Sequence, residues 1–247
     1  MSAPRWKTAI EKTISQFKNQ IVIQIATIDT TRPELGPIPR VRSHIFRSFL
    51  DSPDVPALPL LISSTDIRTP KVGQLTTTPR AEVAWWIEGT RQQFRIIADV
   101  YLLPPTTHAL YAEFAQRLAG AADGTAVALF KHENWELRRV NSFKSLSPTM
   151  KASWCRPTPG TRLEGGQEEA KKWPQRVDEP DVTSMPKEEY EEAKRIWDLA
   201  LGNFVLVIID PFEVDFVDLS TPPDRRSIFR KTKQNGKWSW EEDEVVP

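Results

Sequence analysis

The stretch "AEVAWWIEGTRQQFRIIADVYLL", residues 81–103, decides the fold class of this chain. Apolar and polar residues alternate on both sides of the short segment EGTR (88–91), and aromatic and β-branched residues are frequent, as in half-buried strands. A glycine-containing connection between two such runs predicts a β-hairpin. With Phe94 and Ile96 facing the core, the alternation turns Gln93 to the opposite face of the sheet.

The flanking sequence continues the β pattern and adds few helices. Further strands are predicted over 21–29, 41–49, 57–64, 204–219 (broken at Pro211) and 225–232, with an edge strand in the last segment, 237–247. Helices are predicted over 4–17, 71–77, 107–119 and 187–199. Six or more strands in mostly hairpin order predict a mainly β fold, an antiparallel β-barrel with flanking helices.

Composition excludes several classes of partner. The chain carries 33 basic and 33 acidic side chains, so no global field attracts it to nucleic acid or to an anionic membrane. The longest apolar run, 204–209, is too short to span a bilayer, and the polar N-terminal residues lack a signal-peptide pattern. We therefore expect a cytoplasmic protein with neither a membrane nor a nucleic acid as partner.

Cysteine and histidine usage argues against a disulfide or a metal centre. Cys155 is the only cysteine, and the three histidines are scattered without the spacing of a ligand set. The length of 247 residues is sufficient for a large hydrophobic core, and we expect one domain over residues 1–247. Within it, residues 161–187 are polar and rich in proline and glutamate, which predicts a mobile insertion.

An anion site is predicted in "STDIRTPKVGQ", residues 64–74. Thr69 stands at the N-cap position of a short helix, and Pro70 fits the first helical position. A helix start offers free backbone N–H groups and the positive end of the dipole, and the cations Arg68 and Lys71 flank it. The same stretch carries three hydroxyls, at Ser64, Thr65 and Thr69. The alternative is a capped surface helix with two solvated cations.

A second group of cations lies in the strand predicted over 41–49. Arg42 and Arg47 belong to this strand, and Arg40 immediately precedes it. Barrel strands seldom carry three arginines unless an anionic group meets them. Strict alternation puts Arg42 and Arg47 on opposite faces, so a shared ligand requires a bulge or a position near the barrel rim.

The order of these segments, "PRVRSHIFRSF" (39–49) followed by "STDIRTPKVGQLTTTPRAEVAWWIEGTRQQFRI" (64–96), resembles the pyridoxamine 5′-phosphate oxidase-like FMN-binding proteins. It is most similar to the eukaryotic branch of this family. In that branch the motif TD-R-[ST]-x-K stands in place of the oxidase motif SRK. The similarity covers roughly residues 1–160 and 204–247. It implies a split β-barrel that forms a homodimer and holds FMN at the interface between protomers.

The resemblance assigns the phosphate of FMN to the segment after the third predicted strand. Ser64 and Thr65 match the Tyr-Thr pair that ends this strand in the family. Lys71 matches the lysine of SRK, a phosphate contact. Pro70 stands where the arginine of that motif would be, and Arg68 is expected to supply the displaced guanidinium, with the hydroxyl of Thr69 as a further donor.

The flavin ring is assigned to two strands. Arg42 and Arg47 match the first and last positions of the family's R-x-x-x-x-K strand, which lies along the flavin, with arginine in place of the lysine. Gln93 matches a glutamine that hydrogen-bonds flavin. The segment "SWCRPTPGTRL" (153–163) falls where the oxidase presents polar side chains to the flavin from the other protomer, although a rigid turn at a barrel end is an equal interpretation.

The vitamin B6 half of the oxidase site is missing from the sequence. The oxidases close with R-x-H near the C-terminus, whereas the matching region here reads "TPPDRRSIFRK" (221–231). We therefore expect an FMN-binding flavoprotein, an FMN-dependent oxidoreductase of unknown substrate. Two alternatives stay open: a non-catalytic FMN carrier or sensor, and a barrel interaction module that binds another phosphate-bearing ligand.

Overall fold

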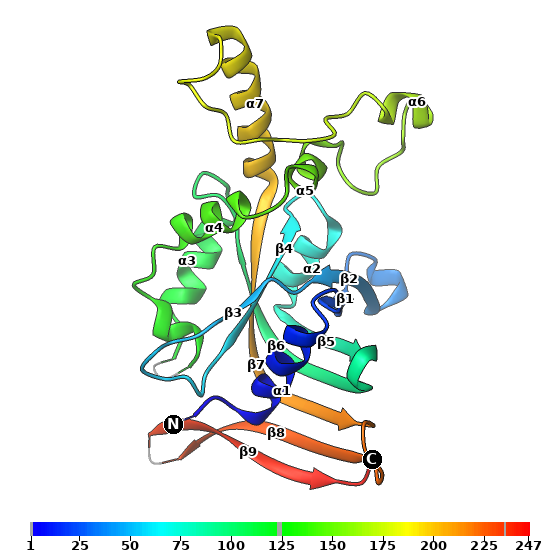
Figure 1. The fold of residues 1–247 in the computed structure, drawn as a ribbon, viewed down its shortest axis with the longest axis vertical. Helices are drawn as coiled ribbons and strands as arrows, with labels where there is room; N and C mark the ends of the chain where they lie inside the picture. Colours follow the sequence, from blue (N-terminus) through cyan, green and yellow to red (C-terminus); the bar gives the residue numbers. More distant parts are fainter. Residues whose placement is uncertain (1, 123–124, 235) are drawn as a thin grey trace.

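The computed structural model describes residues 2–122, 125–234 and 236–247. Within these ranges nine strands form one sheet in which each pairing is antiparallel, with the order β2-β1-β5-β6-β7-β4-β3 and with β8 and β9 added to the far half of β7 (Figure 1). The strands are β1 (Val22–Asp29), β2 (Ile38–Ile45), β3 (Ser48–Leu50), β4 (Leu60–Asp66), β5 (Arg80–Ile87), β6 (Gln92–Leu103), β7 (Phe204–Asp218), β8 (Arg225–Gln234) and β9 (Lys237–Val245).

The hairpin predicted over 81–103 is confirmed as β5 and β6. Trp85 pairs with Phe94 across it, and both side chains are fully buried. The turn between the strands is a 3-10 turn, Glu88–Thr90, followed by Arg91 in the left-handed region with φ of 49°. Burial alternates along both strands, so the apolar residues of one face fill the barrel interior while Gln93 lies on the opposite face.

The long strand β7 connects two hydrophobic cores. Val205 and Val207 belong to the core inside the barrel, whereas Leu206 and Ile208 pack in a second core between the sheet and the helices. Burial on both faces explains why 204–209 is an unbroken apolar run. The break expected at Pro211 is wrong, because the strand continues through it and the register with β6 shifts by one residue at this point.

The strand predicted over 41–49 is divided in two. β2 begins at Ile38, three residues before the predicted start, and ends at Ile45, and β3 begins at Ser48. Between them the chain changes neighbours: the Phe46 amide donates to the Ile21 carbonyl, and the Arg47 amide donates to the Ile62 carbonyl of β4, both at 2.8 Å. This crossing removes the alternation that would place Arg47 opposite Arg42.

The helices are α1 (Arg5–Gln16), α2 (Pro70–Thr77), α3 (Tyr111–Ala119), α4 (Trp135–Lys144), α5 (Pro148–Ala152), α6 (Gly166–Ala170) and α7 (Lys187–Asn203). Short 3-10 turns occur at Pro33–Leu35, Val127–Phe130 and Ser153–Cys155. Figure 1 shows α3 and α4 on one side of the sheet, α7 projecting from the end opposite β8 and β9, and both termini near β8 and β9. The segment predicted to be a mobile insertion contains α6, and its mobility stays a prediction.

Candidate functional site

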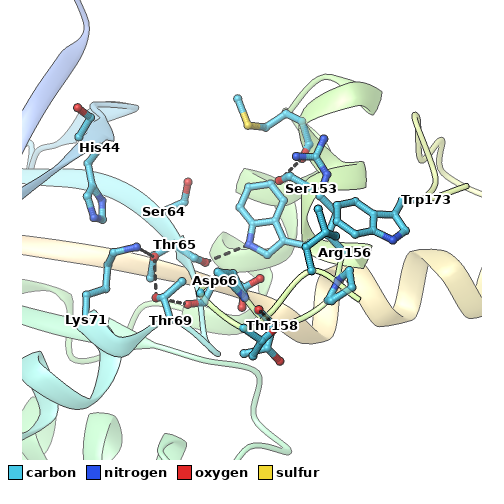
Figure 2. Close-up of a pocket in the computed structure, with 18 of the residues that line it drawn as sticks. His44, Ser64, Thr65, Asp66, Thr69, Lys71, Ser153, Arg156, Thr158 and Trp173 are labelled. Carbon is cyan, nitrogen blue, oxygen red and sulfur yellow. Dashed lines mark hydrogen bonds between the residues drawn. The ribbon is translucent and has the colours of Figure 1, made fainter. Parts of the chain in front are cut away.

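A cavity of about 830 Å³ lies between the barrel and the segment that follows α4 (Figure 2). Its volume falls in the range of small-molecule sites, roughly 300–1,000 Å³. The barrel wall comes from the end of β2, the end of β4 and the start of α2: Ser43, His44, Ile45, Arg47, Ser64, Thr65, Asp66, Thr69 and Lys71. The opposite wall consists of Met150, Ser153, Trp154, residues 156–164, Glu169 and Trp173.

Two cations on the barrel wall have only hydroxyl partners. The Lys71 Nζ donates to Thr65 Oγ1 at 3.1 Å, and the Arg47 Nε donates to Ser64 Oγ at 3.3 Å. No described carboxylate lies within 4.0 Å of either cation. Burial lowers the pKa of both groups; for Lys71 the neighbouring Arg42 lowers the pKa further, and the carboxylate of Asp66, beyond ion-pair distance, partly offsets this. A half-buried cation without a direct ion-pair partner is unfavourable, so this wall fits an anionic ligand.

The start of α2 stands beside these cations. Thr69 occupies the N-cap position and Pro70 the first helical position, as the sequence predicts. The Thr69 hydroxyl, however, donates to the Asp66 carbonyl at 2.7 Å, and no side chain caps the first helical amides. The positive end of the helix therefore keeps donor capacity toward an anion.

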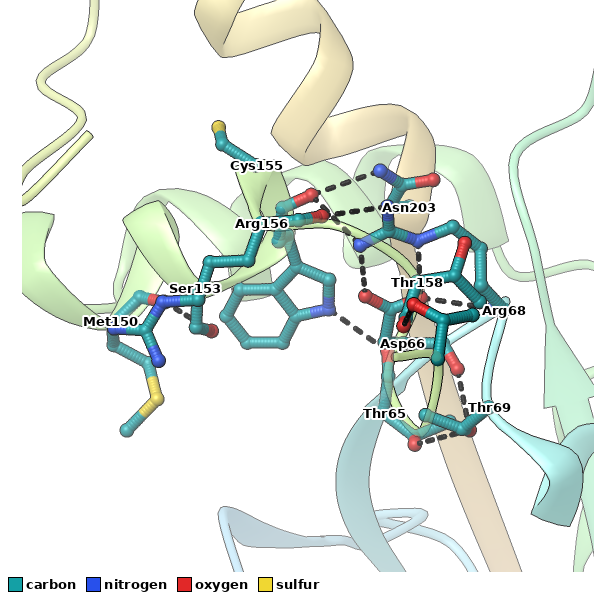
Figure 3. A network of polar contacts seen from close by, with 12 residues as sticks. Thr65, Asp66, Arg68, Thr69, Met150, Ser153, Cys155, Arg156, Thr158 and Asn203 are labelled. Carbon is teal, nitrogen blue, oxygen red and sulfur yellow. Dashed lines mark hydrogen bonds and ion pairs between the residues drawn. The ribbon is translucent and has the colours of Figure 1, made fainter. Parts of the chain in front are cut away.

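Arg68 contacts neighbouring chain segments and does not line the cavity (Figure 3). Its Nε and Nη2 donate to the two carboxylate oxygens of Asp66 at 3.0 and 2.6 Å. Its Nη1 and Nη2 also donate to the carbonyls of Arg156 and Trp154 at 2.8 and 3.2 Å. The guanidinium thus connects the end of β4 to the opposite wall of the cavity. A phosphate contact by Arg68 stays a prediction.

Arg42 also lies outside the cavity lining. Its guanidinium donates to Thr27 Oγ1 of β1 and to Gln74 Oε1 of α2, and Thr27 in turn donates to Gln74. These contacts fix α2 against the barrel. Gln93 is placed on the outer face of β6, opposite Trp86 and Val217, and does not line the cavity either.

The structure therefore brings together five of the eight predicted site residues and separates the other three. Arg47, Ser64, Thr65, Thr69 and Lys71 share the cavity. The predicted site did not include His44, although strand alternation places it on the same face as Arg42. It also had no signal for Trp173, because the path of the 161–187 segment is not visible in a local pattern.

The barrel wall belongs to a recognisable domain. Residues 3–104 match the family model described as "Pyridoxamine 5'-phosphate oxidase, FMN-binding domain". These residues are similar to the FMN-binding domain of that family. The matched residues include β1 to β6 and α2, and so contain Arg47, Lys71 and the hydroxyls beside them. The opposite wall of the cavity, from Met150 on, lies outside the matched residues.

Solved structures confirm the split-barrel fold expected from the sequence. A pyridoxamine 5′-phosphate oxidase-related, FMN-binding protein from Nostoc punctiforme is 22% identical with a TM-score of 0.67, and all of each chain is covered. PhzG from Burkholderia lata, in complex with tetrahydrophenazine-1-carboxylic acid, is 17% identical with a TM-score of 0.54 over 100% of this chain and 94% of that one. No curated protein sequence matches the chain.

Two further observations bear on the kind of site. Within the described part of the chain, His, Cys, Asp and Glu side chains do not gather in groups of three or more that could hold a metal ion. In the same residues, each helix is too short or too polar to cross a membrane.

Proposed function

We propose that the chain binds FMN in the cavity between β4, α2 and the segment 150–173, and that it is an FMN-dependent oxidoreductase of unknown substrate. The observation that carries the location is the pair of half-buried cations, Arg47 and Lys71, which face one cavity without a carboxylate partner. The observation that carries the cofactor is the similarity of residues 3–104 to that FMN-binding domain.

The phosphate of FMN fits the Lys71 end of the cavity. Lys71 supplies an ammonium group, and Arg47 supplies a guanidinium suited to phosphate geometry. The hydroxyls of Ser64, Thr65 and Thr69 and the uncapped start of α2 supply short donors. Arg68 holds this end of β4 against the carbonyls of the opposite wall, so in this proposal it positions the donors rather than contacting the phosphate.

The remaining ring contacts are proposed to come from a homodimer. The outer face of β2, β1 and β5 carries apolar side chains that are open to solvent, among them Val41, 69% exposed, and Trp86, 40% exposed. Register places Gln93 on this same face, directly opposite Trp86. A second copy of the chain on this face would bury the apolar residues and bring its Gln93 toward a flavin at the interface. The cytoplasmic location stays a prediction.

When bound, FMN supplies the redox chemistry. The chain contributes the anion site, the donors that orient the phosphate, and walls that limit access of water. The apolar wall formed by Met150, Leu163 and Trp173 lies across the cavity from the cations and offers a surface for a flat ring.

Electron transfer can be tested directly. The FMN-loaded chain is titrated with NADPH and with NADH in the absence of oxygen, and loss of the visible flavin band is recorded. We expect one of the two nucleotides to bleach the band. Bleaching by dithionite but by neither nucleotide would argue against an oxidoreductase that takes its electrons from a nicotinamide nucleotide and favour an FMN carrier.

A further inference from the structure

His44 borders the same cavity and carries an unpartnered buried nitrogen. The residue lies on β2 with a relative exposure of 6%, and its ring is at the Lys71 end of the cavity (Figure 2). Its Nδ1 is 3.2 Å from Ser63 Oγ of β4. Its Nε2 is buried and has no hydrogen-bond partner among the residues that the structure describes.

The Ser63 hydroxyl determines which ring nitrogen carries the proton. This hydroxyl donates its single hydrogen to the Ile45 carbonyl at 2.9 Å, because a carbonyl can only accept. The contact with His44 therefore requires that Nδ1–H donates to the serine oxygen. In the neutral ring the proton is then on Nδ1, and Nε2 has a free lone pair.

The surroundings keep the ring neutral and leave Nε2 as an acceptor among donors. Burial, then the positive charges of Lys71 and Arg42, lower the pKa of His44 from 6.5 to about 3. The ammonium of Lys71 and the guanidinium of Arg47 on the same wall can only donate. The phosphate-ester dianion of a ligand brings acceptors alone, so it satisfies these cations but not Nε2.

We propose that Nε2 of His44 accepts a hydrogen bond from a hydroxyl or N–H group of the ligand in this cavity, with Ser63 as the positioning residue that fixes the tautomer. The inference rests on the proposed function, since FMN offers both the phosphate for the cations and the ribityl hydroxyls and ring N–H for His44. The site thereby distinguishes a phosphate ester that carries hydrogen-bond donors from a donor-free dianion such as sulfate.

Binding of FMN and of sulfate, a dianion without a hydrogen-bond donor, to the full chain tests this by calorimetry. The variant His44→Phe keeps a ring and removes the acceptor, and His132→Phe makes the same change at an exposed position outside the cavity. We expect His44→Phe to weaken FMN binding about fivefold to tenfold, the worth of one neutral hydrogen bond, and to leave sulfate binding unchanged. His132→Phe should bind both as the wild type does.

Nitrogen-15 spectra of the histidine rings of the wild-type chain provide a test that needs no variant to fold. The free protein should show a protonated Nδ1 and a bare Nε2 for His44, and FMN should shift the Nε2 resonance upfield, as expected for a nitrogen that accepts a hydrogen bond. Sulfate should not shift this resonance, because it has no hydrogen to donate. In Ser63→Ala the preference for the Nδ1–H tautomer should be lost.

The outcomes separate this inference from the proposed function. The role of His44 would be overturned if the wild-type chain binds FMN without a change in the Nε2 resonance. It would also be overturned if His44→Phe binds FMN as tightly as the wild type does. Either result would leave FMN in the cavity. Failure of the wild-type chain to bind FMN would overturn both.

Discussion

Replacing Lys71 with methionine separates recognition of the phosphate from recognition of the rest of the ligand. The methionine keeps an unbranched apolar stem and removes the ammonium that faces the cavity from the start of α2. A hydrogen bond to a charged group contributes about 1.5–3 kcal/mol, so Lys71→Met should weaken FMN binding about 10- to 150-fold. Riboflavin lacks the phosphate, and its affinity should change less than about threefold.

The burial of Lys71 adds a second expectation for the same variant. Its ammonium is half-buried, its only hydrogen-bond partner among the described residues is Thr65 Oγ1, and burial lowers its pKa. Removing a desolvated charge should therefore leave the melting temperature of the FMN-free chain unchanged or raise it. A residue that binds the ligand at a cost in stability is expected to behave this way.

Fluorescence titration with FMN and riboflavin, with thermal melts of the free chain, measures both effects. Lys18→Met, at an exposed position after α1, is the matched control and should change neither affinity. An equal loss of affinity for FMN and riboflavin in Lys71→Met would refute the placement of the phosphate, as would an unchanged affinity for both.

Three further predictions follow from contacts around the site. Arg68→Ala removes the bridge from Asp66 to the carbonyls of the opposite wall, so it should lower the melting temperature yet keep the preference for FMN over riboflavin. In the folded chain the pKa of His44 is about 3, below its ordinary value of 6.5. Between pH 3 and pH 6.5 the unfolded chain therefore binds more protons than the folded chain, and the free energy of unfolding falls as the pH drops below 6.5. This loss should reach about 1.4 kcal/mol for each pH unit in urea unfolding of the wild type and be absent from His44→Phe. Val41→Glu, on the exposed outer face, should convert a dimer to a monomer in analytical ultracentrifugation.

Each of these predictions has a contrary result. An Arg68→Ala variant that binds FMN no better than riboflavin would show that the guanidinium contacts the phosphate. Identical pH dependence of unfolding in the wild type and His44→Phe would show that His44 titrates normally. A wild-type chain that sediments as a monomer, or a Val41→Glu dimer, would contradict the use of the outer face.

The elements with strong local signals could be predicted from the sequence. Alternation alone defines the β5–β6 hairpin and the outward side of Gln93. The pair Thr69–Pro70 marks the start of α2, which brings Lys71 back beside Thr65. These features depend on residues close in sequence, and their physical causes are backbone preferences and side-chain periodicity.

Other features depend on distant partners that no local pattern reveals. β2 ends at Ile45, where the Phe46 amide still donates to Ile21 just before β1 but the Arg47 amide already donates to Ile62 of β4. The sequence alone indicates that Arg68 is available to a ligand. In the fold its guanidinium instead donates to the Asp66 carboxylate and to the carbonyls of Trp154 and Arg156. The second wall of the cavity comes from 150–173, a segment whose position is set by tertiary packing rather than by its own periodicity.

A visible absorbance spectrum of the purified chain, recorded after addition of FMN and desalting, shows whether this cavity holds FMN. We expect a retained flavin band corresponding to about one FMN per chain in the wild type and a strongly reduced band in Lys71→Met. A wild-type chain that emerges colourless would contradict FMN binding and leave the cationic cavity to another phosphate-bearing ligand.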